Sequence, residues 1–203
     1  MKYQDYVIKD GKFVGEFEKM YKEFDDPWNQ TSEGYVENSI SRQIVCNYLK
    51  NFNIKSIVEF GCGLGKTTKF ISDNTGVDIL GVDISETSIK KSKSKYPELK
   101  FEVNDISNII EYNNYDCFFF SEITWYILEN NKIDKIFDLM KKKLEGKYFI
   151  HNLVFYKGQQ MYGLDYFSNL EQFIEFCPFK LIGKNYTEFE DTDCSETSSI
   201  FII

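Results

Sequence analysis

The sequence is poor in the residues that mark secreted, metal-binding and nucleic-acid-binding proteins. Its five cysteines are scattered without a CxxC pair, so we expect reduced thiols, no disulfide framework and no metal site. Acidic residues outnumber basic ones and give a net charge of −8. Partners such as nucleic acid and anionic membranes need Lys and Arg to neutralise their phosphates. The composition therefore argues against both kinds of partner.

Long apolar runs are also absent. The first residues contain no apolar core of a signal peptide, and no stretch approaches the roughly 20 apolar residues of a membrane span. With 203 residues, 42% of them hydrophobic and 17% aromatic, the chain suits one cytoplasmic globular domain. We expect residues 1–52 to form N-terminal helices and a lid, and residues 53–203 to form the sheet core.

The most informative stretch is a short apolar run that meets three glycines. Residues 56–60 are predicted to be a buried strand and residues 66–71 the start of a helix, so Gly61, Gly63 and Gly65 lie in the loop between them. Glycines there permit unusual backbone angles and let a ligand approach the main chain. The loop is therefore predicted to be a binding site.

Spacing separates the cofactors that use such a loop. A P-loop needs four residues between its first glycine and GK[ST], but this chain has three, and a dinucleotide fingerprint needs glycine where Lys66 stands. The chain instead contains ExGxGxG, beginning at Glu59, and Asp83 at the end of the next predicted strand. This pattern resembles motif I of class I S-adenosylmethionine-dependent methyltransferases. An NAD-dependent oxidoreductase and a non-catalytic cofactor-binding module remain as alternatives.

The resemblance implies S-adenosyl-L-methionine as cofactor, with S-adenosyl-L-homocysteine as product. It places the ribose hydroxyls on Asp83, and it places the adenine beside Ile84, Asp105 and Ile106. Trp28 and Tyr35, in a polar segment, are expected to cover the cofactor mouth, where aromatic faces favour a sulfonium. The expected cofactor-binding residues are Trp28, Tyr35, Arg42, Glu59, Gly61, Cys62, Gly63, Gly65, Thr67, Asp83, Ile84, Asn104, Asp105, Ile106, Ser121 and Glu122.

Two residues are candidates for the catalytic base. His151, the only histidine, is expected at the end of a strand over residues 147–150, with a hydrogen-bonded structural role as the alternative. Glu122 is the second candidate, in a run SEITWYI that resembles the fourth motif of small-molecule methyltransferases. This run lacks the proline-rich motif of enzymes that methylate nucleic-acid bases. On this hypothesis, replacing His151 with alanine would lower turnover far more than cofactor binding.

The remaining pattern predicts an α/β protein with a Rossmann-like, doubly wound sheet of seven mostly parallel strands. Its last two strands, residues 179–189 and 198–203, are expected to form the antiparallel hairpin typical of the methyltransferase sheet. We also expect an aromatic helix over residues 12–25, a second helix with Val36 and Ile40 on its inner face, and a capping box of Ser168 and Glu171.

A narrower resemblance concerns the acceptor. PWNQTSEGYVENSI, followed by the glycine loop and SEITWYIL, resembles nodulation-type methyltransferases and their relatives from capsule and other surface-polysaccharide gene clusters. This resemblance implies O- or N-methylation of a small polar acceptor, a sugar or phosphate-containing precursor. The expected assembly is a monomer or a homodimer.

Overall fold

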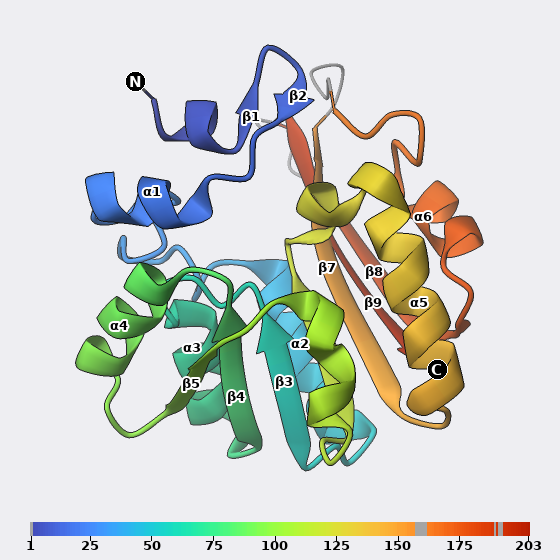
Figure 1. Cartoon of the computed structure of the whole chain (residues 1–203). Coiled ribbons are helices and arrows are strands. Elements are labelled where there is room, and N and C mark those ends of the chain that lie inside the picture. Colours follow the sequence, from blue (N-terminus) through green and yellow to red (C-terminus); the bar gives the residue numbers. More distant parts are fainter. Residues whose placement is uncertain (1, 157–161, 189, 191–192) are drawn as a thin grey trace.

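The computed structural model describes residues 2–156, 162–188, 190 and 193–203, and its main feature is one seven-stranded sheet (Figure 1). The strand order is β5-β4-β3-β6-β7-β9-β8. All neighbouring pairs from β5 to β7 are parallel, whereas β9 is antiparallel to both β7 and β8. The predicted fold class is therefore confirmed. The strands are β3 Ser56–Phe60, β4 Asp78–Asp83, β5 Lys100–Val103, β6 Cys117–Ser121, β7 Tyr148–Tyr156, β8 Lys180–Glu188 and β9 Cys194–Ile202.

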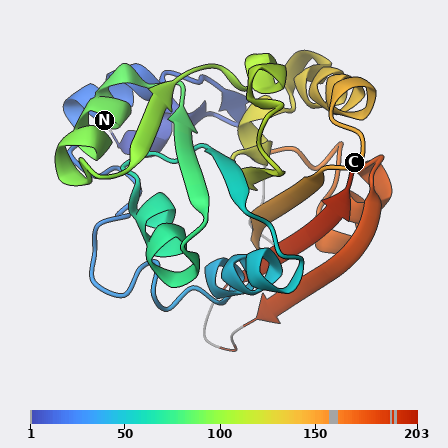
Figure 2. The ribbon, with the colours of Figure 1, turned by 90° about the horizontal axis from the view of Figure 1, so that it is seen from below.

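Helices cover both faces of the sheet. Alternate residues of β6 point to opposite faces, so Phe118 and Phe120 pack with α5 and α6 while Phe119 packs with α2 and α3. Figure 2 shows α5 on the opposite side of the sheet from α2 and α3. Two-sided burial explains why this strand is apolar throughout. The helices are α2 Ile40–Asn51, α3 Lys66–Thr75, α4 Glu86–Lys95, α5 Lys132–Lys143 and α6 Leu170–Phe176, and the 3-10 helices are Tyr3–Tyr6, Ile106–Tyr112, Thr124–Ile127 and Glu129–Asn131.

The N-terminal segment differs from the expected helix over residues 12–25. It forms a small hairpin of β1 Ile8–Lys9 and β2 Lys12–Phe13, and only then α1 Phe17–Glu23. Asp10 and Gly11 turn the hairpin with φ of 51° and 73°, and Gly15 has φ of 71°, which a helix cannot accommodate. An Asp-Gly pair is typical of a hairpin turn, but the spacing of the aromatic residues led to the prediction of a helix.

Four other predicted boundaries are wrong, one of them at the last strand, where β9 begins at Cys194 and not at residue 198. Helix α2 begins after its N-cap Ser39, whose hydroxyl accepts from the Arg42 N–H, so Val36 precedes the helix. Asn169, not Ser168, caps α6 through the backbone N–H of Gln172. Strand β7 continues to Tyr156, past the expected end at residue 150. Residues 157–161, which follow it, and residue 189 at the end of the expected strand 179–189 lie outside the described residues.

Candidate functional site

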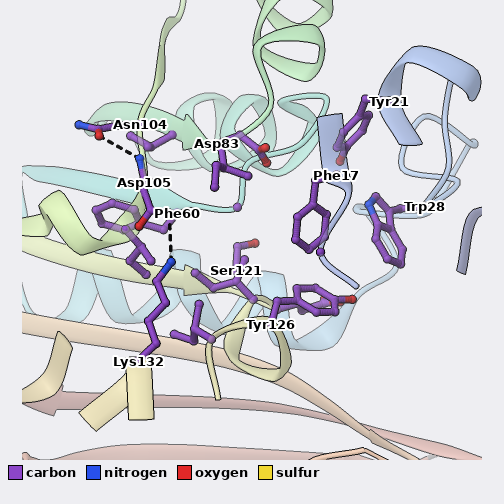
Figure 3. A pocket seen from close by; sticks show the side chains of 18 of the residues that line it. Phe17, Tyr21, Trp28, Phe60, Asp83, Asn104, Asp105, Ser121, Tyr126 and Lys132 are labelled. Carbon is purple, nitrogen blue, oxygen red and sulfur yellow. Dashed lines mark hydrogen bonds and ion pairs between the residues drawn. The ribbon is translucent and has the colours of Figure 1, made fainter. Parts of the chain in front are cut away.

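A cavity of about 330 Å³ opens at the carboxyl ends of β3, β4, β5 and β6. Ligands of open α/β sheets bind at this edge, where the strand order reverses. Figure 3 shows that side chains from the strand ends and from the N-terminal segment face each other across it. The expected site residues that line the cavity are Trp28, Tyr35, Arg42, Gly61, Asp83, Ile84, Asn104, Asp105, Ile106, Ser121 and Glu122.

The glycine loop contributes one residue, Gly61, directly to the cavity. Its φ is 82°, and a Cβ there would lie 2.0 Å from Cγ2 of Ile123, so only glycine fits. Gly63 is covered by the N-terminal segment, because a Cβ there would meet the Gln30 side chain at 2.5 Å. Gly65 makes room for the Phe101 ring, and Cys62 is buried in the same cluster. Gly63, Gly65 and Cys62 therefore shape the loop and do not line the cavity.

Asp83 is fixed at the end of β4 by backbone donors. Its two oxygens accept from the N–H groups of Gly63 and Ser85, both at 2.9 Å. Burial raises the pKa of this carboxyl, and these hydrogen bonds oppose the shift without cancelling it. Ile84, which follows, exposes 52% of its surface beside the cavity. A carboxylate next to an exposed apolar side chain suits a nucleoside, with its ribose on Asp83 and its base on Ile84.

Asp105 and Asn104 form the next part of the wall, at the end of β5. Asp105 accepts from the Ser107 N–H at 2.8 Å and from Nζ of Lys132 at 3.0 Å. Burial raises the pKa of Asp105, but the Ser107 and Lys132 interactions outweigh it and lower the pKa overall. Lys132 also lines the cavity (Figure 3). Sequence reasoning missed it because it starts α5, far from any quoted motif.

Glu122 follows β6 and lines the cavity. Its φ is 61°, which is uncommon for a residue with a side chain, and its N–H donates to the Asn152 carbonyl at 3.2 Å. Its carboxylate forms an ion pair with Arg42 at 2.8 Å. Unusual backbone angles of this kind cluster at functional sites.

Arg42 reaches the cavity from α2 and is almost fully buried. Its Nε donates to the hydroxyl of Thr67 at 3.1 Å, and its guanidinium lies 4.9 Å from the centre of the Tyr35 ring. Thr67 thus orients the side chain of Arg42 but does not itself line the cavity. The only arginine of the chain is held in one orientation, with Glu122 as its counter-ion.

Glu59 and His151 were expected at the site, but neither lines the cavity. Glu59 is fully buried in β3 and accepts from the hydroxyl of Thr68 at 2.5 Å, which ties the strand to α3. Burial raises its pKa to about 7.

His151 lies inside β7, where it is fully buried. Its ring stacks on Phe173 at 3.6 Å, and its Nε2 shares a hydrogen bond of 2.7 Å with the Thr124 hydroxyl. Burial lowers its pKa to about 3. The structure therefore places His151 in the core, against its expected position at a strand end. Of the two candidates for the base, only Glu122 borders the cavity.

The N-terminal segment supplies an aromatic wall opposite the strand ends. Phe13, Phe17 and Trp28 all contact Tyr126, with ring centres 6.3, 5.2 and 6.1 Å away. All four rings line the cavity. Trp28 was expected here, whereas Phe13 and Phe17 were expected only as part of a helix over residues 12–25. Tyr126 was missed, although it lies within the quoted SEITWYI run.

Polar links hold this segment on the sheet. Gln30 accepts from the Leu64 N–H at 2.9 Å, which fixes the segment over the glycine loop. Glu18 of α1 accepts from the Ser85 hydroxyl at 2.7 Å and from the Thr87 N–H at 3.1 Å, at the start of α4. In return, Lys91 of α4 donates to the Tyr21 carbonyl at 2.9 Å. The two helices therefore satisfy each other's free backbone groups.

Two kinds of feature are absent from the described part of the chain. In those ranges no three His, Cys, Asp or Glu side chains gather into a group that could hold a metal ion. No helix described there has the length and apolarity that crossing a membrane requires.

Comparison with known proteins shows a similarity to methyltransferases over part of the chain. Residues 57–146 match the model of the family described as "Methyltransferase domain". This range contains the glycine loop, Asp83, Asp105 and Glu122. Over this part of the chain the protein is similar to methyltransferases.

Among individual proteins, the chain is similar to NodS. The crystal structure of the N-methyltransferase NodS from Bradyrhizobium japonicum WM9, in complex with S-adenosyl-L-homocysteine, superposes with a TM-score of 0.68. The superposition covers 88% of this chain and 92% of NodS at 15% identity, which shows a shared fold.

Two curated relatives are more similar in sequence. The putative methyltransferase 235L of Invertebrate iridescent virus 6 is 32% identical over 120 residues, which is 56% of this chain and 44% of the relative. Phosphoethanolamine N-methyltransferase 1 of Zea mays is 31% identical over 124 residues, which is 57% of this chain and 24% of the relative. The chain thus spans less than half the length of either relative.

The methyltransferases that the chain resembles use S-adenosyl-L-methionine, and the lining residues fit this cofactor. Asp83 would accept from the ribose hydroxyls, and Ile84 and Ile106 would give apolar surface to the base. Gly61 leaves the main chain open where a side chain would close it. When bound, the cofactor supplies an electrophilic methyl group on a sulfonium sulfur.

Proposed function

We propose that the protein transfers a methyl group from S-adenosyl-L-methionine to an oxygen or nitrogen of a small polar acceptor. The observation that carries the proposal is the convergence of Gly61, Asp83, Asp105 and Glu122 from four strand ends on one cavity. Such a cavity holds two reactants in fixed orientation, and well-oriented groups reach effective molarities of about 10⁵ to 10⁸ M. Positioning by the fold is the main catalytic contribution.

Glu122 is our candidate for the residue that contacts the acceptor. A hydroxyl must lose its proton as it attacks, and so must an ammonium before it attacks, so a carboxylate beside the nucleophile helps both. Glu122 has the position for this role, because it lines the cavity directly after β6 and is oriented by Arg42. His151 lacks the position, because its ring is enclosed by Phe173 and Thr124.

For the acceptor we propose a sugar or phosphate-containing precursor of a capsule or other surface polysaccharide. The support is the resemblance of the segment around Trp28 and of the SEITWYI run to the nodulation-type methyltransferases. Both NodS and the Zea mays relative are N-methyltransferases by name, which favours nitrogen as the methylated atom. We propose a cytoplasmic location and a monomer or homodimer as the assembly.

The testing experiment is calorimetric titration with S-adenosyl-L-homocysteine and, separately, with NAD. We expect micromolar binding of the first and none of the second. Binding of NAD alone would overturn the proposal in favour of an oxidoreductase. Normal binding of S-adenosyl-L-homocysteine, with no methyl transfer from the cofactor to any of a panel of amines, sugars and phosphorylated precursors, would identify a non-catalytic module.

A further inference from the structure

The cavity continues beyond the strand ends into an aromatic recess, which we define by Phe13, Phe17, Trp28 and Tyr126. The three N-terminal rings surround Tyr126, and all four border the cavity. Figure 3 shows Phe17, Trp28 and Tyr126 grouped at the end of the cavity away from Asp105 and Lys132. Aromatic faces attract cations, most strongly where water is excluded.

The charges around the cavity point to a positive occupant. Four carboxylates line it, from Asp83, Asp105, Glu122 and Glu129, against the two cations Arg42 and Lys132. Each of the two cations is already in an ion pair, Arg42 with Glu122 at 2.8 Å and Lys132 with Asp105 at 3.0 Å. A phosphate or carboxylate on the acceptor would have to displace one of these carboxylates. An ammonium meets no such competition.

Glu122 can serve as counter-ion to a second cation. A carboxylate has about four lone-pair sites, so the bond from Arg42 leaves acceptor capacity on Glu122. Arg42 also fixes the carboxylate in place, which reduces the conformational entropy that a second donor has to overcome.

We propose that the aromatic recess and Glu122 bind the acceptor through a protonated amine, and that this nitrogen is methylated. This inference rests on the proposed function and names its acceptor class. The ammonium first gives one proton to Glu122 or to water. The nitrogen lone pair then forms the bond to the methyl carbon while the carbon–sulfur bond breaks. Its electron pair stays on sulfur, which becomes a neutral thioether, and the methylated nitrogen takes the positive charge.

A matched pair of probes tests the recess directly. Choline carries a quaternary ammonium, and 3,3-dimethylbutan-1-ol has the same shape without the charge. Each is titrated calorimetrically into protein saturated with S-adenosyl-L-homocysteine, which has no sulfonium. We expect choline to bind about tenfold or more tightly than its neutral analogue. Equal affinities, or no detectable choline binding, would overturn the amine site.

Substitutions of residues in the recess test whether choline binds there. Glu122→Gln, Tyr126→Leu and Phe17→Leu should each weaken choline binding about tenfold, with two aromatic variants made in case one does not fold. Tyr186→Leu is the control, because it makes the same change at an exposed ring on β8 outside the cavity. Unchanged choline affinity in folded recess variants contradicts the proposal. If those variants lose only the preference for S-adenosyl-L-methionine over S-adenosyl-L-homocysteine, the rings serve the sulfonium and the inference is wrong.

The two proposals fail in different ways. If the proposed function is wrong, the unmodified protein does not bind S-adenosyl-L-homocysteine. If only the amine proposal is wrong, S-adenosyl-L-homocysteine still binds, but choline binds no more tightly than its neutral analogue.

Discussion

The two walls of the cavity are built in different ways. The strand-end wall presents Gly61 and Asp83 from adjacent parallel strands, and the core beneath fixes both. The N-terminal wall presents aromatic rings from a segment that joins the sheet through side-chain links such as that of Glu18 to Ser85. The first wall is part of the sheet, whereas the second is held by polar links and by a separate apolar cluster that includes Met20, Tyr21 and Leu64. If our proposals hold, cofactor recognition by the first wall and acceptor choice by the second can be changed separately.

The largest expected effect comes from closing the strand-end wall with Gly61→Ala. The new Cβ would lie 2.0 Å from Ile123 Cγ2 at a φ of 82°, so we expect a loss of about 3 kcal/mol of folding free energy. We also expect binding of S-adenosyl-L-homocysteine to disappear in calorimetry. The matched control is Gly76→Ala at the end of α3, where φ is 69° but no atom lies within 4 Å. It should cost only about 1 kcal/mol.

Asp83→Asn tests the same wall with a side chain of nearly the same size. The amide keeps one acceptor oxygen, but it loses the charge and turns its NH2 donor towards the backbone N–H of Gly63 or Ser85, so we expect about 100-fold weaker binding of S-adenosyl-L-homocysteine. Asp78→Asn is the control at the opposite end of β4, where the carboxylate is exposed and pairs with Lys100. Should the two variants bind the cofactor product equally well, Asp83 would have no special role.

The two walls also differ in how far the sequence predicts them. Strand β3 was predicted to the residue, because a buried apolar run followed by glycines marks the end of a strand locally. Those marks place Gly61, Asp83, Ile84 and Asp105 at one sheet edge, as parallel pairing requires.

Periodicity does not predict the N-terminal wall. Phe13 and Phe17 have helical spacing, yet Gly15 breaks the helix and puts the two rings around Tyr126. Which distant ring an aromatic side chain meets depends on tertiary packing, which no local pattern contains. His151 fails for a related reason, since the length of β7 is set by pairing with β9.

His151→Gln tests whether a residue in the core behind the strand-end wall affects cofactor binding as well as stability. We expect a loss of about 2 kcal/mol at pH 7, from the stacking on Phe173 and the bond to Thr124, with unchanged S-adenosyl-L-homocysteine affinity. The pKa of His151 is about 3 when folded, against an ordinary value of 6.5. The unfolded chain therefore binds the extra proton between these values, and this part of the stability falls as pH falls from 6.5 towards 3.

Denaturant unfolding of both proteins across that range should show the difference between wild type and variant shrinking at low pH. A folded His151→Gln variant that binds S-adenosyl-L-homocysteine normally but has lost most of its turnover would restore the original hypothesis of a histidine base.

The smallest expected effect comes from loosening the N-terminal wall with Glu18→Gln. Burial raises the pKa of Glu18, but bonds from Ser85 and Thr87 outweigh it and lower the pKa to about 2, against an ordinary value of 4.5. The stabilisation is therefore complete above pH 4.5 and is lost as pH falls towards 2. We expect the variant to lose about 1 kcal/mol at pH 7 and to lack that part of the acid dependence in denaturant unfolding.

In the same variant, the affinities for choline and for S-adenosyl-L-homocysteine should change by different factors. Because Glu18 holds α1 and its aromatic neighbours on α4, choline affinity should fall a few-fold while S-adenosyl-L-homocysteine affinity falls less than twofold. Glu16→Gln is the control, since its carboxylate pairs only with the exposed Lys19 among the described contacts. An equal loss of both ligands would mean that α1 belongs mechanically to the strand-end wall, and the division between cofactor recognition and acceptor choice would not hold.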